Sequence, residues 1–443
     1  MSVVVLLLLL AVAVTRSPFI LLHGRFWAEE GAVHFRHAFS DSSPTNMLFV
    51  YKNSGYLDFF CNAATWVAAR GPLVDAPLVT AWLSFGVLAA LLWVTLFWPS
   101  ELLPTPFARI SAGVLLVVGT LAIAEVWLNA LEAQTYWALL ALLLLFVHLS
   151  KLNRRRFLVG TGFLAMAALS GVYAAALAPL FVVRALQQRT RRHVVQAAVL
   201  CTSALLQFAI AFALRNSGDL SSKKLVFRGI GSVARATAGW HVAGFLLGQQ
   251  NARTLIDHTR SKLGLVVLCV FAVGVLVFIA TLLAHTPNAR ITLLLGGALL
   301  LEEVLVNYGA GNIAGGRFAV VPIGILTLMM VHGAATARPR WLARAGAVLC
   351  GIVFVFGLSG FWTYQATTLR CINCPRWDAQ VRQWRAGQTD RLAIWPYPAW
   401  FITLQHRASR TARVDAPAMR PVAIRKIGSW PLLHPHPRRT RTP

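Results

Sequence analysis

The chain has 443 residues, of which 57% are hydrophobic and 13% charged, and its mean hydropathy is +0.63. Soluble proteins have about a quarter of their residues charged, so this composition excludes a soluble globular protein. It predicts a polytopic membrane protein. The 41 Lys and Arg residues against 15 Asp and Glu give a net charge of +26, and the positions of these charges decide what they mean.

Apolar segments predict an all-α membrane protein with about eleven transmembrane segments. Two of them, Phe157–Ser170 and Val172–Val183, are short and are separated by Ser170-Gly171, so we expect a hairpin that enters and leaves from one side. The others are Val3–Leu22, Pro77–Trp98, Ile110–Asn129, Ala133–Leu149, Val194–Leu214, Leu263–Ala284, Ile291–Asn307, Phe318–Ala334 and Ala345–Tyr364. Residues 1–364 are thus the predicted transmembrane domain.

The first segment has two interpretations. Its short apolar core and the small residues Ala11-Val12-Ala13 fit a cleaved signal peptide. No positive residue precedes that core, however, and the apolar stretch resumes at Phe19–Leu22 after Arg16. We therefore favour a retained first helix.

Positive charges predict the orientation, because short loops rich in Lys and Arg stay in the cytoplasm. An N-terminus inside and a C-terminus outside the plasma membrane put thirteen cations and one acid, Glu101, in the inner loops. These cations are Arg109, Lys151, Arg154, Arg155, Arg156, Arg184, Arg189, Arg191, Arg192, Arg290, Arg338, Arg340 and Arg344.

The outer loop 215–262 departs from this rule, with eight positive charges and two acids, Asp219 and Asp257. Its middle, Ile230–Leu247, is amphipathic and would lie along the membrane surface, where the cations face anionic lipid. The alternative is a miscounted span.

Two adjacent carboxylates, Glu29 and Glu30, stand near the start of the first outer loop, residues 23–75. We expect a helix at the membrane interface here, anchored by Phe26, Trp27, Val33 and Phe35. A carboxylate at that depth would accept a proton from an attacking hydroxyl, or ligate a divalent cation together with substrate phosphates. In the structural alternative, the carboxylates pair with Arg25 or Arg36.

Further polar residues are expected at the same side of the membrane. Tyr56 follows a predicted turn and would close over a substrate or cap the loop. Asn129, Glu132 and Gln134 occupy the outer turn between the third and fourth spans. They form either a polar connector or a site for sugar hydroxyls.

Glu302 and Glu303 fall inside an apolar span, where acids are costly and face a cavity or a partner. They predict either a proton or cation path, as in a transporter, or ion pairs with Arg290 or Arg317. Glu125, inside the third span, is open to the same two interpretations. Arg317 follows a run of small residues and would either bind a phosphate through its guanidinium or anchor the span at the interface.

After residue 364 the composition changes. Residues 365–406 are rich in Trp and Arg and predict a small outer appendage, whereas the basic, Pro-rich tail 407–443 predicts disorder. Cys371 and Cys374 fit a redox pair, half a zinc site or a local disulfide, and the outer location favours the disulfide. The basic tail matches no nucleic-acid-binding module, so we expect no nucleic-acid partner.

Several short motifs together resemble the C-type glycosyltransferase superfamily, multi-spanning enzymes that use polyprenyl-phosphate-linked sugars. The resemblance is architectural over about residues 1–405. The motifs are Trp27-Ala28-Glu29-Glu30-Gly31, the turn Asn129–Gln134, the hairpin from Ser170-Gly171 to Pro179-Leu180, Gly316-Arg317-Phe318 and the outer Trp395-Pro396-Tyr397.

The resemblance implies sugar transfer from a polyprenyl-phosphate donor to a glycan, lipid or protein acceptor at the outer face of the membrane. The family's acidic residue in the first outer loop corresponds to Glu29 or Glu30, although members more often carry at least one Asp there. The cation that binds the lipid phosphate corresponds to Arg317 or, in the outer basic loop, to Arg228 or Arg235. A lipid or solute transporter that uses Glu302 and Glu303 is the competing hypothesis, and a non-catalytic scaffold is a third.

Overall fold

The computed structural model describes residues 2–120, 123, 125–218, 229–258, 261–309, 316–363, 376–396 and 399–405. The described residues up to Leu404 belong to one compact unit. The expectations for Arg228, for Cys371 and Cys374, and for the tail 407–443 lie outside the described residues.

Five helices in the described ranges are long and apolar enough to cross a membrane. Four are α5 (Ala76–Phe97), α11 (Arg191–Asn216), α14 (Lys262–Ala284) and α17 (Arg340–Thr363); the fifth is α16 (Val320–Thr336), together with the preceding turn η7 (Gly316–Ala319). Multiple apolar helices of this kind indicate an integral membrane protein.

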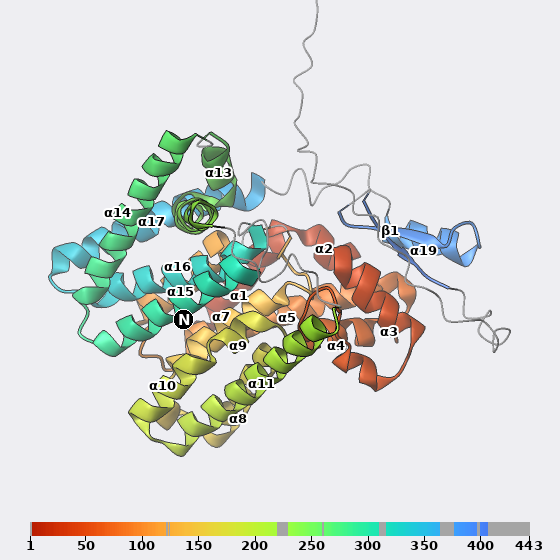
Figure 1. Cartoon of the computed structure of the whole chain (residues 1–443), viewed down its shortest axis with the longest axis horizontal. Coiled ribbons are helices and arrows are strands. Elements are labelled where there is room, and N and C mark those ends of the chain that lie inside the picture. The colour runs from red at the N-terminus through yellow and green to blue at the C-terminus, as the bar shows by residue number, and fades with distance from the viewer. Residues whose placement is uncertain are drawn as a thin grey trace, which may run out of the picture. The chain divides into compact units, whose positions relative to one another are not determined.

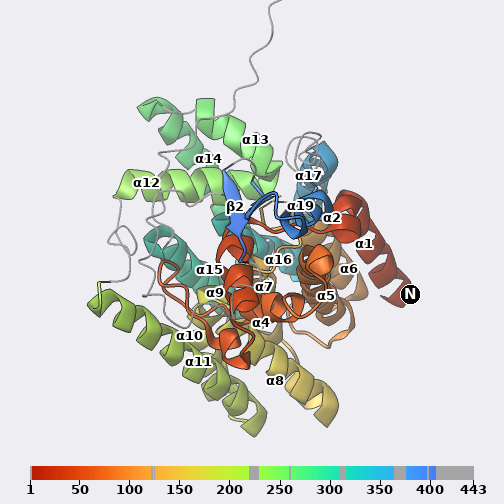
Figure 2. The ribbon, with the colours of Figure 1, turned by 90° about the vertical axis from the view of Figure 1, so that its right-hand side faces the viewer.

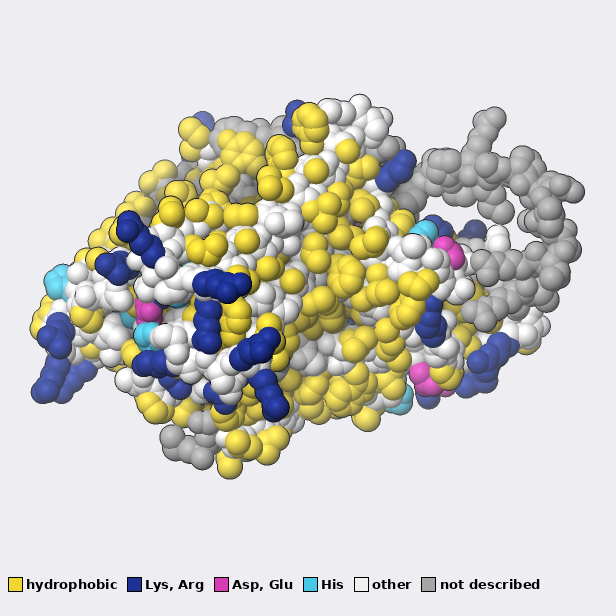
Figure 3. All heavy atoms as spheres, turned by 90° about the horizontal axis from the view of Figure 1, so that it is seen from below, with side chains coloured by type: hydrophobic (Ala, Val, Ile, Leu, Met, Phe, Trp, Pro, Cys, Tyr) yellow, Lys and Arg dark blue, Asp and Glu magenta, His cyan; other side chains and the backbone are white. Residues whose placement is uncertain are grey.

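Two helices form the centre of the bundle. Every residue of α7 (Ala133–Leu145) is buried, and so are nearly all residues of α16. A helix that is apolar all round is stable only when other elements cover it. Peripheral helices such as α11 and α14 instead expose Phe208, Phe212 and Val270. Figure 3 shows the result, a broad hydrophobic band between two regions of charged side chains.

The expected spans near the N-terminus are interrupted. Val3–Leu22 is divided into α1 (Ser2–Arg16) and α2 (Pro18–His23), because Pro18 starts a new helix. Ile110–Asn129 is helical only through α6 (Pro106–Leu115) and the π-helix η4 (Leu116–Thr120), and is followed by turns. The total of about eleven spans therefore stays a prediction.

The expected short hairpin consists of α8 (Arg154–Leu169), α9 (Val172–Ala176) and α10 (Ala178–Gln188). Figures 1 and 2 show α8, α10 and α11 side by side. Its tip, Ser170-Gly171, lies against the first loop, where Asp58 and Ser170 form an isolated bridge. The hairpin therefore delivers its polar tip to the same place as the first-loop residues.

The prediction of a surface helix at 230–247 is wrong in its second half. This stretch begins with the exposed helix α12 (Ile230–Arg235), but the π-helix η6 (Ala236–Ala243) and α13 (Gly244–His258) pack against α14, α16 and α17. His241, Val242 and Phe245 are buried there. The amphipathic pattern of this half reflects burial against other helices.

The described residues from 377 to 404 fold over the first loop. They contain α19 (Trp377–Arg385) and an antiparallel pair, β1 (Arg391–Ile394) and β2 (Trp400–Thr403), in which Leu392 faces Ile402. The all-α prediction misses this hairpin, whose short strands carry little periodicity. Within the first loop lie η1 (Glu30–Phe35), α3 (Arg36–Ser40), η2 (Pro44–Leu48), α4 (Phe59–Ala68) and η3 (Leu73–Asp75).

The expected membrane anchors of the first loop have another role. Phe26 and Phe35 are 1% and 0% exposed and share a hydrophobic cluster with Trp377 and Trp384 of α19. The ring of Phe26 meets that of Trp377 edge-on at 5.3 Å, and Trp27 is also buried. These aromatics therefore pack beneath the C-terminal elements instead of inserting into the interface.

Candidate functional site

The first loop is hydrogen-bonded to Trp395, which follows β1, just before the two glutamates. Trp27 and Trp395 form a parallel bridge, the Trp395 N–H donates to the Phe26 carbonyl at 3.1 Å, and the Ala28 N–H donates to the Trp395 carbonyl. Ala28 has a φ of 41°, a left-handed conformation that costs energy for a residue with a side chain. Such strain persists only where the surrounding structure imposes it. Here the strained Ala28 sets the direction of the chain at Glu29 and Glu30, where the π-helix η1 begins.

Glu30 holds two parts of the backbone together. Its Oε2 accepts from the Trp27 N–H at 3.0 Å, and its Oε1 accepts from the Ala130 N–H at 3.1 Å. The side chain is 1% exposed, and burial raises its pKa from 4.5 to about 7 against the opposing hydrogen bonds. Arg25 is close enough for its charge to act on Glu30. Glu30 therefore connects the first loop to the outer turn.

Glu29 has a different environment. It is half-buried, and no residue in the described ranges forms a hydrogen bond or ion pair with it. Its charge nevertheless acts on Arg317, Glu132 and Glu125, so the four side chains lie within electrostatic range of one another. The expected pair of Glu29 with Arg25 or Arg36 is not formed, and Glu29 keeps an available carboxylate.

Arg317 lies between two carboxylates. Its Nη1 donates to Glu132 Oε1 at 2.9 Å and is 3.0 Å from Glu125 Oε1. The Arg317 and Glu125 side chains are 28% and 34% exposed, whereas that of Glu132 is 3% exposed. We call Glu29, Glu125, Glu132 and Arg317 the acidic cluster. Its Arg317 and Glu125 side chains are partly exposed, and its Glu132 side chain is buried.

Glu132 is the buried acid of the acidic cluster. Burial raises its pKa to about 7, although the positive charge of Arg317 opposes the shift. Near neutral pH, Glu132 therefore exchanges between the neutral and the ionised form. Because only the ionised form attracts Arg317 strongly, this proton controls how firmly the guanidinium is held.

The surroundings of the acidic cluster include Tyr56, Gln134 and the Ser170-Gly171 tip between α8 and α9. Gln134 Nε2 donates to the Tyr56 hydroxyl at 3.0 Å. Gly171 has a φ of 134°, and a Cβ there would come within 2.2 Å of Gln134 Oε1, so only glycine permits this approach. Tyr173 on α9 lies in electrostatic range of Glu132 and Tyr56.

Asn129 stabilises the turn instead of facing the opening. Its Oδ1 accepts from the Leu131 N–H at 2.9 Å, its Nδ2 donates to the Glu125 carbonyl at 3.2 Å, and it is 2% exposed. The turn thereby presents Glu125 and Glu132 on the same side. Asn129 is a positioning residue, and the expectation that it meets a sugar directly does not fit its burial.

The intramembrane acids do not pair as expected. On α15 (Ala289–Gly309), Glu303 Oε1 is 2.6 Å from His241 Nδ1, and its Oε2 accepts from Thr237 Oγ1 at 2.8 Å. Glu302 is 0% exposed, and its carboxylate finds no partner among the described residues. Neither acid forms an ion pair with Arg290 or Arg317. Arg317 pairs with Glu125 and Glu132 instead, and Arg290 lies about 18 Å from Glu302 along α15.

The structure brings together Glu29, Glu132, Gln134, Tyr56 and Arg317, all of which the sequence singled out. Glu125, which the sequence predicted to lie inside a span, belongs to the same region. Two polar residues there were not singled out from the sequence, Tyr173 and the buried Asp58. Scarcity is the signal that could have found them, because the chain has 15 acids and 7 tyrosines.

Within the described ranges, no group of three or more His, Cys, Asp or Glu side chains is placed to hold a metal ion. A divalent cation at this site stays a prediction. A hollow of about 680 Å³ lies elsewhere, between Phe271 and Phe278 of α14 and Leu349 of α17.

No protein-family model matches the chain, and no curated protein matches it. Among solved structures, the chain is similar to the crystal structure of ArnT from Cupriavidus metallidurans bound to undecaprenyl phosphate. That similarity covers 80% of this chain and 75% of that chain, with 16% sequence identity and a TM-score of 0.41.

Proposed function

We propose that the protein is an integral membrane glycosyltransferase that moves a sugar from a polyprenyl-phosphate donor to an acceptor hydroxyl at the outer face of the membrane. The acidic cluster supports this most directly. It combines an available carboxylate, Glu29, with a guanidinium, Arg317, on a partly open surface of a membrane protein.

Glu29 is the general base of the proposed reaction. It accepts the proton of the acceptor hydroxyl, whose oxygen then forms a bond to the anomeric carbon of the donor. The bond between that carbon and the phosphate oxygen breaks, and the phosphate leaves with the electron pair. Arg317 balances the charge that develops on the leaving oxygen.

The contacts of Glu30 favour a positioning role over the role of base. Both of its oxygens already accept backbone N–H groups, and it is 1% exposed. We assign it the role of a positioning residue that fixes Glu29 relative to the turn carrying Glu132. The partly exposed Tyr56 then offers its hydroxyl to the sugar, and the buried Gln134 orients that hydroxyl.

Charge balance requires a proton in the acidic cluster. With three ionised carboxylates and one guanidinium the cluster carries a net charge of −2, which repels a phosphate. The raised pKa of Glu132, about 7, allows its protonation as the donor binds. Arg317 contacts both acids through Nη1 alone, so Nη2 and Nε remain to donate to phosphate.

The test is sugar transfer by the purified full chain in lipid vesicles, with a panel of polyprenyl-phosphate pentoses and hexoses as donors. Glu29→Gln and Arg317→Gln should each abolish most of the transfer. Asp41→Asn and Arg36→Gln, at exposed positions of the same loop, are the matched controls and should keep it. Full transfer by both site variants would refute the proposal.

Proton-coupled or cation-coupled transport is the second candidate function. It is favoured by the buried Glu302, whose carboxylate has no hydrogen-bond partner among the described residues, next to the Glu303–His241 pair. The two candidates separate on one variant, because Glu302→Gln abolishes coupled transport but leaves a glycosyltransferase with Glu29 and Arg317 active.

A further inference from the structure

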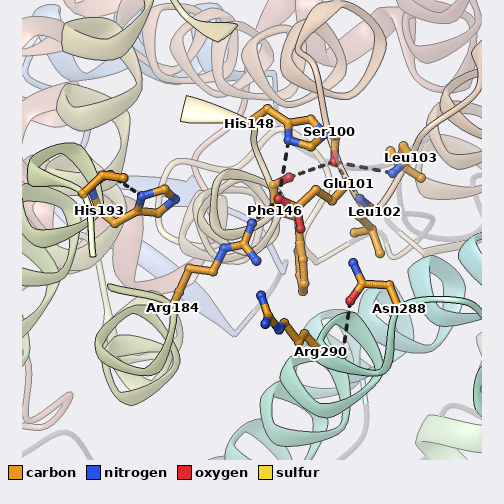
Figure 4. A network of polar contacts seen from close by, with 11 residues as sticks. Ser100, Glu101, Leu102, Leu103, Phe146, His148, Arg184, His193, Asn288 and Arg290 are labelled. Carbon is orange, nitrogen blue, oxygen red and sulfur yellow. Dashed lines mark hydrogen bonds and ion pairs between the residues drawn. The ribbon is translucent and has the colours of Figure 1, made fainter. Parts of the chain in front are cut away.

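A second polar site lies at the other end of α7 from the acidic cluster. Here the turn between α5 and α6 is fixed by backbone hydrogen bonds, from the Glu101 N–H to the Phe146 carbonyl and from the His148 N–H to the Pro99 carbonyl, both 2.9 Å. The Glu101 carboxylate accepts from Arg184 Nη2 and is 3.5 Å from His148 Nδ1. Figure 4 shows this arrangement.

Arg184 is buried with unused donors. It is 2% exposed, and its Nε has no hydrogen-bond partner among the described residues. A buried guanidinium normally satisfies its donors, so an orphaned Nε calls for an acceptor. Arg192 provides the contrast, because its Nη1 donates to the carbonyls of Leu149 and Leu152 and has a purely structural role.

Arg290 brings a second guanidinium to the same place. It lies at the start of α15, where its N–H donates to Asn288 Oδ1 at 3.2 Å, and α15 packs against the helix that carries Arg184. Figure 4 shows the guanidinium groups of Arg184 and Arg290 directed toward each other beside Glu101. The positive end of the α15 dipole adds to their field. Two guanidinium groups thus lie near one carboxylate, which forms an ion pair with Arg184.

The surroundings add more positive charge. Burial lowers the pKa of His148, Glu101 opposes this shift, and the charges of Lys151, Arg184 and Arg109 reinforce it. Membrane orientation alone does not require this convergence, since most other cations at this end, such as Arg154 and Arg155, are simply exposed. The arrangement has excess positive charge and a free donor, as an anion site does.

We propose that Arg184 and Arg290, with the start of α15, bind a phosphate group. We call these two residues with Glu101 the basic cluster. The planar guanidinium groups would each donate two parallel hydrogen bonds to phosphate oxygens. The phosphate belongs either to the headgroup of an anionic membrane lipid or to a free phosphate ion.

The test measures saturable binding to the purified full chain in a neutral detergent, by native mass spectrometry and thermal shift. The probes are short-chain phosphatidylglycerol, short-chain phosphatidylcholine and inorganic phosphate. Arg290→Gln is the informative variant, because Arg290 is exposed and its loss leaves the Arg184–Glu101 pair in place. Arg155→Gln, exposed on α8, removes the same charge at a position outside the site.

The wild-type chain should bind phosphatidylglycerol saturably and phosphatidylcholine at least tenfold more weakly. Arg290→Gln should weaken phosphatidylglycerol binding by about tenfold or more, and Arg155→Gln by less than twofold. If inorganic phosphate at equal concentration binds as well and displaces the lipid, the site is assigned to free phosphate; if it does not, the site is assigned to the headgroup. Equal weakening by both variants, or no saturable binding of either anionic probe, would overturn the proposal.

Discussion

The acidic cluster and the basic cluster are built from the same two charged groups in opposite proportions. In the first, Arg317 is shared by Glu125 and Glu132, with Glu29 nearby. In the second, Glu101 faces Arg184 and, beside it, Arg290. Each cluster contains a single group of the minority charge, so its majority charge is incompletely neutralised.

The two clusters use the scarce acids of the chain differently. The helix α7 begins directly after Glu132 and ends directly before Phe146, whose carbonyl fixes Glu101, so it spans about 20 Å between the clusters. A surplus of carboxylates suits proton acceptance and sugar hydroxyls, whereas a surplus of guanidinium groups suits phosphate. A site for donor transfer needs both, and the acidic cluster contains both.

The largest effect is expected from Glu29. Glu29→Gln removes the proposed base without changing the shape of the side chain, so kcat should fall by about 10²- to 10⁴-fold while donor binding changes little. The measurement is single-turnover sugar transfer. Glu101→Gln, which removes the acid of the basic cluster, should leave the rate within a few-fold; a similar loss in both variants would erase the functional distinction between the clusters.

Arg317→Gln should have the next largest effect. Loss of the guanidinium removes hydrogen bonds to the phosphate and the positive charge beside the leaving oxygen, so kcat/KM should fall by about 10- to 100-fold through a higher donor KM and a lower kcat. Arg317→Lys should restore only part of it, because an ammonium cannot form two parallel hydrogen bonds. An unchanged KM in the Arg317→Gln variant would mean that the donor phosphate binds at another position.

The pH dependence should reveal Glu132. Its pKa is raised to about 7, so it is protonated below that pH and ionised above it, where it competes with phosphate for Arg317. Donor affinity should therefore fall by about tenfold from pH 6 to pH 8 in the wild-type chain. In Glu132→Gln that fall should disappear, and an identical decline in the variant would assign the titration to another group.

Glu30 should show the smallest effect on chemistry and a clear effect on stability. Its folded-state pKa of about 7 exceeds the ordinary 4.5, so the folded chain retains a proton that the unfolded chain has lost between these values. Stability therefore falls as the pH rises from 4.5 to 7, by up to about 3 kcal/mol from this residue.

Glu30→Gln removes that titration. The melting temperature of the variant, measured in detergent against wild type, should rise relative to wild type by a few degrees between pH 5 and pH 8. A constant difference across this range would mean that Glu30 ionises as readily in the folded chain as in the unfolded one.

Local sequence predicted the apolar helices and singled out much of the candidate site, because both depend on patterns of residues close in the chain. Glu29-Glu30, the polar turn before α7 and Arg317 are visible as rare polar residues beside long apolar runs. The sequence could not distinguish Glu29 from Glu30. That difference depends on a tertiary contact, the hydrogen bond that the Ala130 N–H donates to Glu30 from a hundred residues away.

Long-range contacts also explain why the expectations for Phe26, Phe35 and the position of Glu125 were wrong. Phe26 and Phe35 have the composition of membrane anchors, and only the distant Trp377 and Trp384 bury them. Glu125 looked like an acid inside a span, but the helix stops before it and a turn carries it to Arg317. Long-range packing, which propensity does not record, decided each case.

The most direct test of the account is a structure of the full chain with a polyprenyl-phosphate sugar bound. The account predicts phosphate oxygens at about 3 Å from the Arg317 guanidinium and the sugar next to Glu29. A donor whose phosphate instead lies between Arg184 and Arg290, with the acidic cluster empty and unchanged, would contradict it.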